Sequence, residues 1–185
     1  MKFLHGDSFF KIDKLAALAV FFIIGASNSL GKQPARLEFK GLEIRSAVLP
    51  AQVEQALGVK CGDGLNGAII CNGRSSIAER KGDINALISK EGRLERIRIT
   101  VHSNDYSHVM SSLTKKFSTP DKTSQDGAQN GFGALLEDEK KIWLGKNGTQ
   151  LSIHKYAGNT ETCVIYFSTE EDRARLRRPA TLSDL

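Results

Sequence analysis

In the first half of the chain, short apolar and polar runs alternate. Residues 37–44 alternate apolar and polar side chains, which predicts a strand with a bulge at Gly41. The next run, "LPAQVEQALG", has a proline suited to a first helical turn and a glycine suited to a C-terminal cap, so it predicts a short helix. "GAIIC" predicts a brief strand, and "INALISKEGRLERIRITV" predicts a hairpin with Glu91 and Gly92 at its tip.

The second half begins with a helical pattern. Apolar residues from Tyr106 to Phe117 recur at helical spacing, Ser103 or Asn104 can cap the start, and Pro120 lies beyond the end. "DKTSQDGAQNGFG" then predicts a polar loop. Strands are predicted by four later runs, "ALLED", "KIWLG", "QLSIHKY" and "TCVIYF", with hairpin turns at Asn147-Gly148 and Gly158-Asn159.

These elements predict an α+β fold, with short helices packed on one face of an antiparallel sheet. We expect one domain over residues 37–168, after a linker at 28–36. Each half has a helix and several strands, which suggests two similar units at 37–101 and 103–167, although the two sequences are not alike enough to establish a repeat. Residues 169–185 are predicted to be a charged tail with one short helix.

The N-terminus has the features of an export signal. Three lysines precede the apolar run "LAALAVFFIIGA", and small and polar residues follow it. The run is shorter than the roughly 20 residues of a membrane-spanning helix and fits the core of a signal peptide. We therefore expect residues 1–27 to be a signal peptide cleaved after Ser27, or alternatively after Ser29. An uncleaved anchor and a buried N-terminal helix are the other interpretations. No cysteine follows the run, which excludes a bacterial lipid anchor there.

Composition and charge narrow the classes of partner. The chain has 185 residues, of which 40% are hydrophobic and 25% charged, and its formal net charge is +5. This composition is ordinary for a globular protein. The sequence lacks the clustered basic patch with interleaved aromatic residues that would predict nucleic-acid binding. The densest basic run, "RARLRRP", could contact an anionic surface, although solvated arginines are the simpler interpretation. Its candidate contacts are Arg173, Arg175, Arg177 and Arg178.

The stretch "VKCGDGLNGAIICNG" poses a choice between two kinds of loop. Its glycines have the G-x-G-x-x-G spacing of a dinucleotide-binding loop, and Cys61 and Cys71 flank them. A phosphate-binding loop needs a strand before it and a helix after it, whereas here a helix precedes and a strand pattern follows. We therefore predict a Cys61–Cys71 disulfide that closes a tight loop. Cys163, within an apolar strand pattern, is predicted to be a buried free thiol.

Few residues suggest catalysis or metal binding. The four histidines include no H-x-x-x-H or H-E-x-x-H spacing, and the chain has no C-x-x-C. Cys163 and His154 could neighbour each other on adjacent strands as a nucleophile and a base, although apolar surroundings would raise the pKa of the thiol and blunt it. The sequence therefore predicts no catalytic, cofactor-binding or metal-binding residue.

The segments "FKGLEIRSAVLPAQVEQALG" and "YSHVMSSLTKKFSTP" each have a strand or turn followed by a helix that ends near glycine or proline. This pattern resembles the small α/β module of the outer-membrane assembly lipoprotein family and of the secreted β-lactamase inhibitor proteins, over roughly residues 38–167. With the Cys–Cys loop and a single late tryptophan, it also resembles uncharacterised exported bacterial proteins. Ser118 departs from the pattern where glycine is expected, and the lipoprotein's anchoring cysteine is absent. The resemblance implies a helix-plus-sheet fold and a non-catalytic binding role, and it transfers no functional residue.

The leading hypothesis is an exported domain, periplasmic or secreted, that binds a protein or a cell-envelope component without catalysis and without a cofactor. A thiol-dependent enzyme using Cys163 and His154 is one alternative. A membrane-anchored accessory subunit, with its N-terminal segment uncleaved, is the other.

Overall fold

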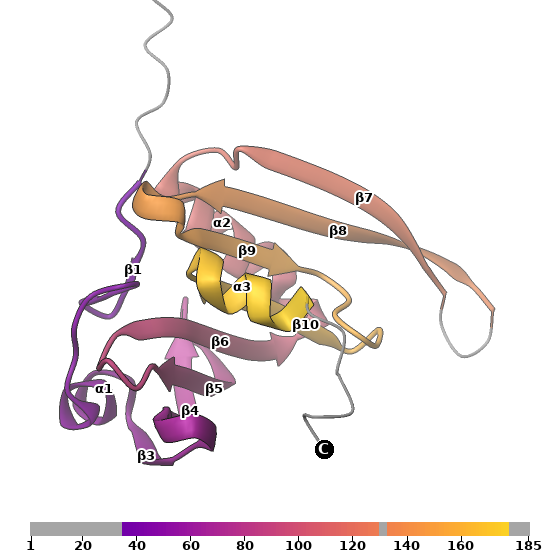
Figure 1. The fold of residues 1–185 in the computed structure, drawn as a ribbon. Coiled ribbons are helices and arrows are strands. Elements are labelled where there is room, and N and C mark those ends of the chain that lie inside the picture. The colour runs from indigo at the N-terminus through magenta and orange to yellow at the C-terminus, as the bar shows by residue number, and fades with distance from the viewer. Residues whose placement is uncertain (1–34, 130–132, 178–185) are drawn as a thin grey trace, which may run out of the picture. The chain divides into compact units, whose positions relative to one another are not determined.

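The computed structural model describes residues 35–129 and 133–177 (Figure 1). They form an α+β fold with one large antiparallel sheet of eight strands, a separate pair of very short strands, and three α-helices. The predicted fold class is confirmed. The predicted signal peptide at 1–27, the linker up to residue 34 and Arg178 all lie outside the described residues.

The elements have the following bounds. The helices are α1 (Pro50–Leu57), α2 (Tyr106–Phe117) and α3 (Glu170–Arg177). The small sheet pairs β1 (Glu38–Phe39) with β2 (Leu42–Glu43). The strands of the large sheet are β3 (Val59–Asp63), β4 (Ile69–Ile77), β5 (Arg80–Ile88), β6 (Leu94–His102), β7 (Lys122–Gln129), β8 (Leu135–Leu144), β9 (Gln150–His154) and β10 (Thr162–Ser168).

The strand order in the large sheet is β3-β4-β5-β6-β10-β9-β8-β7. The four strands that follow α1 therefore occupy one half of the sheet, and the four that follow α2 occupy the other. The halves meet where β6 pairs with β10, with Ile99 opposite Ile165. In every other pair of neighbours the two strands are consecutive in the sequence, so this central pairing is the long-range one.

The core lies on the sheet face that α1 and α2 cover. Side chains alternate between the two faces of a strand, so the cross-strand register defines which residues share a face. Cys71, Ala86, Ile97, Phe167, Leu151 and Trp143 form one aligned row on this face, and all are fully buried. Phe117 of α2 contacts this row, with its ring centroid 6.3 Å from that of Phe167. In Figure 1, α3 lies on the side of the sheet away from α2.

The predictions of α1, α2 and the hairpins are confirmed, but the predicted cap of α2 is wrong: its N-cap residue is Asp105, without a side-chain cap, and Ser103 and Asn104 form a preceding 3-10 turn. Pro50 occupies the first turn of α1, and Gly58 caps its end in the left-handed conformation with φ 70°. The apolar stripe of α2 is buried, with Val109 fully enclosed. The hairpin of β5 and β6 turns at Glu91 and Gly92 as predicted.

Three strand predictions were wrong in detail. Residues 37–44 form the tight β1–β2 hairpin instead of one bulged strand, because Lys40 and Gly41 both have positive φ, 50° and 80°. The predicted polar loop forms strand β7, paired with β8 along its whole length. The two predicted strands "ALLED" and "KIWLG" are parts of the single strand β8.

Candidate binding groove beside α3

The sheet face opposite the core carries a mixture of polar and apolar side chains. Register aligns Ile142 of β8, Ser152 of β9 and Tyr166 of β10 in one row across three strands. The adjacent row contains Lys140, His154 and Val164 from the same strands. Helix α3 follows β10 directly and packs over part of this face, so the two rows and the helix enclose a groove.

Helix α3 is fixed to the sheet through Asp172, whose side chain is 2% exposed. Tyr166 donates its hydroxyl proton to the Asp172 carboxylate at 2.9 Å, and the Arg96 guanidinium lies 3.4 Å from the same carboxylate. Burial, together with the nearby Asp172 charge, raises the pKa of Tyr166 to about 12, although Arg96 opposes the shift. Arg175 adds an ion pair to Glu95 of β6. The helix is therefore held by a buried charged network.

The groove has a volume of about 530 Å³ and is open to solvent. From the helix, Arg173, Leu176 and Arg177 line it, at the i, i+3 and i+4 spacing of one helical face. The strands contribute the two aligned rows described above. Leu176 is 60% exposed, so a large apolar side chain faces the opening.

The lining of the groove is cationic. Lys140, Arg173 and Arg177 all line it, and no aspartate or glutamate does. Arg173 donates to the Ser168 hydroxyl and carbonyl oxygens and to the Gly148 carbonyl oxygen, all of which are neutral. Burial lowers the pKa of this guanidinium, but arginine stays charged at neutral pH. The groove therefore presents three positive charges without an acidic side chain in its lining.

His154 is held in place at one end of the groove. Its Nε2 lies 2.6 Å from Asp138 Oδ2, and the other Asp138 oxygen accepts the Tyr156 backbone N–H at 3.0 Å. Asp138 is 8% exposed. Both oxygens of this carboxylate are thus occupied by its own chain, and the imidazole has a fixed orientation.

The structure does not bring Cys163 and His154 together. Val164 is the residue paired with His154, so Cys163, next to it in β10, points to the opposite face. Cys163 is fully buried in the core, and burial raises its thiol pKa to about 12. The arrangement therefore lacks the hydrogen bond that an activated thiol needs from a base.

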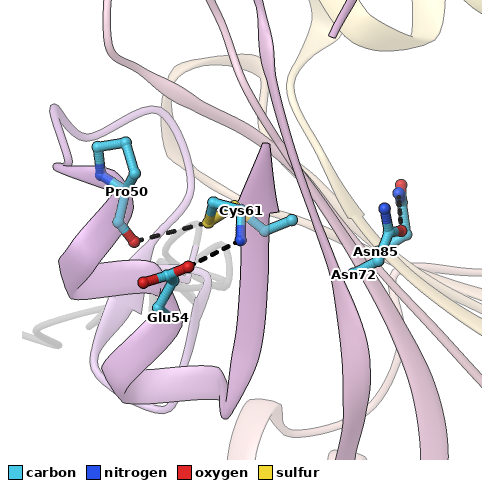
Figure 2. Close-up of a disulfide and its surroundings, with 6 residues drawn as sticks. Pro50, Glu54, Cys61, Asn72 and Asn85 are labelled. Carbon is cyan, nitrogen blue, oxygen red and sulfur yellow. Dashed lines mark hydrogen bonds between the residues drawn. A yellow bond between two sulfur atoms is a disulfide. The ribbon is translucent and has the colours of Figure 1, made fainter. Parts of the chain in front are cut away.

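The predicted Cys61–Cys71 disulfide is present in the structure (Figure 2). The two cysteines face each other across β3 and β4, and the glycine-rich residues between them form the turn of this hairpin. The Cys61 backbone N–H donates to Glu54 Oε1 of α1 at 2.9 Å. The stretch is thus a closed hairpin against α1, without the strand–loop–helix arrangement that binds phosphate.

The arginines predicted to contact an anionic surface have different roles. Arg175 is engaged with Glu95 and Asp172, whereas Arg173 and Arg177 line the groove. Sequence reasoning missed Lys140 as their counterpart across the groove. The alternation within "EDEKKIWL" could have shown that Lys140 shares a face with Ile142, but the pairing with β9 that brings them to α3 has no local signal.

Two further properties concern the part of the chain that the structure describes. Within it, no helix is long and apolar enough to cross a membrane. Within the same residues, no three His, Cys, Asp or Glu side chains gather as a metal site would require.

Comparisons with known proteins found no matching family model, no similar curated protein and no similar solved structure. The resemblance to the assembly lipoprotein and inhibitor families therefore stays a prediction from the sequence.

Proposed function

We propose that the protein is an exported, non-catalytic domain that binds another protein or a cell-envelope component through the groove beside α3. The observation that carries this proposal is the groove itself, an open cationic depression whose floor combines apolar and polar side chains. Binding sites commonly combine an apolar surface with a few placed polar groups. Here Val164 and Ile142 supply the apolar surface, and Lys140 and Arg177 supply the charge.

Preorganisation of the groove wall also supports a binding role. Asp172, Tyr166 and Arg96 fix α3 before any partner arrives, so less conformational entropy is lost on binding. The Cys61–Cys71 disulfide is compatible with an oxidising compartment, where such bonds persist. This is the support for placing the domain outside the cytoplasm, in the periplasm or secreted.

The test is site-specific photo-crosslinking in the producing cell. A photoreactive amino acid replaces Leu176 in the groove, and in a control chain it replaces Leu65, which is 85% exposed on the β3–β4 hairpin. We expect a discrete crosslinked partner from position 176 in the exported fraction and none from position 65. The same crosslinks from both positions, or from neither, would refute the groove as the binding surface.

A further inference from the structure

We propose that the groove beside α3 selects an acidic, extended segment of a partner protein. This inference rests on the proposed binding function and adds the chemistry of the ligand. Three features of the groove carry it: the spacing of its cations, the mixed polar and apolar floor, and the lack of ion pairs at Lys140 and Arg177.

The cations are spread along the direction of the strands. Arg173 donates a hydrogen bond to Ser168, at the end of β10. Lys140 is paired with His154, which is paired with Val164, and Val164 lies four residues before Ser168 in β10. At about 3.3 Å per residue this places the two positions about 13 Å apart along the sheet. Arg177 lies one helical turn beyond Arg173 on the same face of α3. A single compact anion could reach at most the neighbouring Arg173 and Arg177, while an extended segment with several carboxylates could reach all three cations.

The floor of the groove favours a peptide over an acyl chain. Each aligned row combines one apolar residue with polar ones: Ile142 shares its row with Ser152 and Tyr166, and Val164 shares its row with His154 and Lys140. His154 also lines the floor and its side chain is 34% exposed, so an acyl chain laid over it would remove a polar ring from water without offering a hydrogen bond. A peptide backbone offers both donors and acceptors to such a floor, and its alternate side chains can meet the apolar positions.

Two of the three cations, Lys140 and Arg177, are not paired with an acidic side chain among the described residues. Arg173 donates to neutral oxygens, although Glu170, Glu171 and Asp172 of the same helix lie near it. The Asp138 carboxylate beside the groove is occupied by His154 and Tyr156. An incoming carboxylate would therefore gain a charge-assisted hydrogen bond without displacing an existing one.

The experiment measures fluorescence anisotropy of the purified protein with two blocked, fluorescein-labelled octapeptides. One alternates glutamate and valine, and the other has glutamine in place of each glutamate. We expect the acidic peptide to bind at least roughly tenfold more tightly, and the difference to shrink as salt rises. The double variant Lys140→Gln/Arg177→Gln should lose at least roughly tenfold of that affinity.

Arg74→Gln is the matched control variant, because Arg74 is an exposed arginine outside the groove that pairs with Asp83. It should bind the acidic peptide as the wild type does. Fluorescence of the buried Trp143 checks that every variant is folded.

Three results would overturn the inference. They are equal binding of both peptides, unchanged binding by the double variant, and a preference for phosphatidylglycerol vesicles over the acidic peptide. In one outcome, the photoreactive residue at position 176 crosslinks a partner while the glutamine peptide and the double variant bind as the acidic peptide and the wild type do. In that case the binding function stands and the acidic selectivity fails. If position 176 yields no partner and the acidic peptide does not bind, both fail.

Discussion

Ser118 ends helix α2 in a backbone conformation that normally requires glycine. Its φ is 67° and its ψ is −165°, a region that residues with a Cβ rarely adopt. The carbonyl oxygen of the same residue accepts the Trp143 indole N–H at 2.9 Å. The strained conformation is therefore maintained by a contact with the core, and the serine departs from the glycine that the sequence pattern led us to expect.

We expect Ser118→Gly to stabilise the protein by about 1 kcal/mol, because glycine adopts this conformation without strain. The backbone carbonyl that binds Trp143 is retained. Urea unfolding, followed by the fluorescence of the single tryptophan, measures the change. Ser118→Ala is the control: it keeps the Cβ and should give no stabilisation, and an equal gain from both substitutions would contradict the explanation by backbone strain.

At Cys163 the expected result is slow chemical modification. Its thiol is fully buried and its pKa is raised to about 12 by burial, so almost no thiolate is present at neutral pH. A thiol reagent should label this cysteine only after denaturation. Rapid labelling of the native protein at pH 7 would reopen the hypothesis of a thiol enzyme.

At the level of elements, α2 is joined to β8 by one short hydrogen bond. Tyr106 donates its hydroxyl proton to Glu139 Oε2 at 2.6 Å. Partial burial would raise the pKa of Glu139, but the bonds from Tyr106 and Lys141 outweigh it, so the pKa is lowered. Burial and the same hydrogen bond raise the pKa of Tyr106.

We expect Tyr106→Phe to destabilise the protein by about 1–2 kcal/mol at pH 7, since the bond is made to a charged group that is partly exposed. A carboxylate with a lowered folded pKa contributes stability above its unfolded pKa, near 4.3, and loses it as pH falls through the folded value. The deficit of the variant should therefore shrink below about pH 4. Urea unfolding of both proteins at about pH 3 and about pH 7, which bracket the ordinary pKa of glutamate, measures the change. A deficit independent of pH would refute the charged bond.

The disulfide fixes the β3–β4 hairpin at one edge of the sheet. We expect the double substitution Cys61→Ala/Cys71→Ala to destabilise the protein by about 2–3 kcal/mol, because it frees a loop whose ends are 10 residues apart in sequence. Alanine avoids placing a hydroxyl at buried position 71. Reduced wild-type protein is the companion measurement, and a loss confined to one of the two samples would show that the effect is not the cross-link.

The sequence predicted well those elements whose signals are local. Pro50 and Gly58 bound α1, and the cysteines flank a tight turn, so each feature lies within a few residues of its cause. Strand β7 was missed because most of its residues are polar and residues 122–125 are exposed, and its pairing with β8 supplies the order that its composition does not. The groove was missed for a similar reason: Lys140 and Arg177 meet only through the register of three strands and the placement of α3.

On the scale of the whole molecule, each end of the described chain binds the opposite half of the sheet. Near the N-terminal end, Ala35 accepts the Lys146 backbone N–H, and Arg45 donates to the Asn147 carbonyl oxygen. At the C-terminal end, α3 reaches β6 through the Arg96–Asp172 and Glu95–Arg175 ion pairs. The two halves are therefore joined by β6–β10 pairing and by both end segments.

Strand order also has a consequence for biosynthesis. Strand β10 is the last described strand to be made, yet it lies at the centre between β6 and β9. Until it emerges from the ribosome, β6 has an open edge beside the apolar Ile97, Ile99 and Val101, which is a surface that promotes aggregation. A chain stopped after Thr160 should accumulate in inclusion bodies, whereas one stopped after Arg177 should be recovered soluble. If both truncated chains were soluble, the first half of the sheet would have to protect the open edge of β6 without β10.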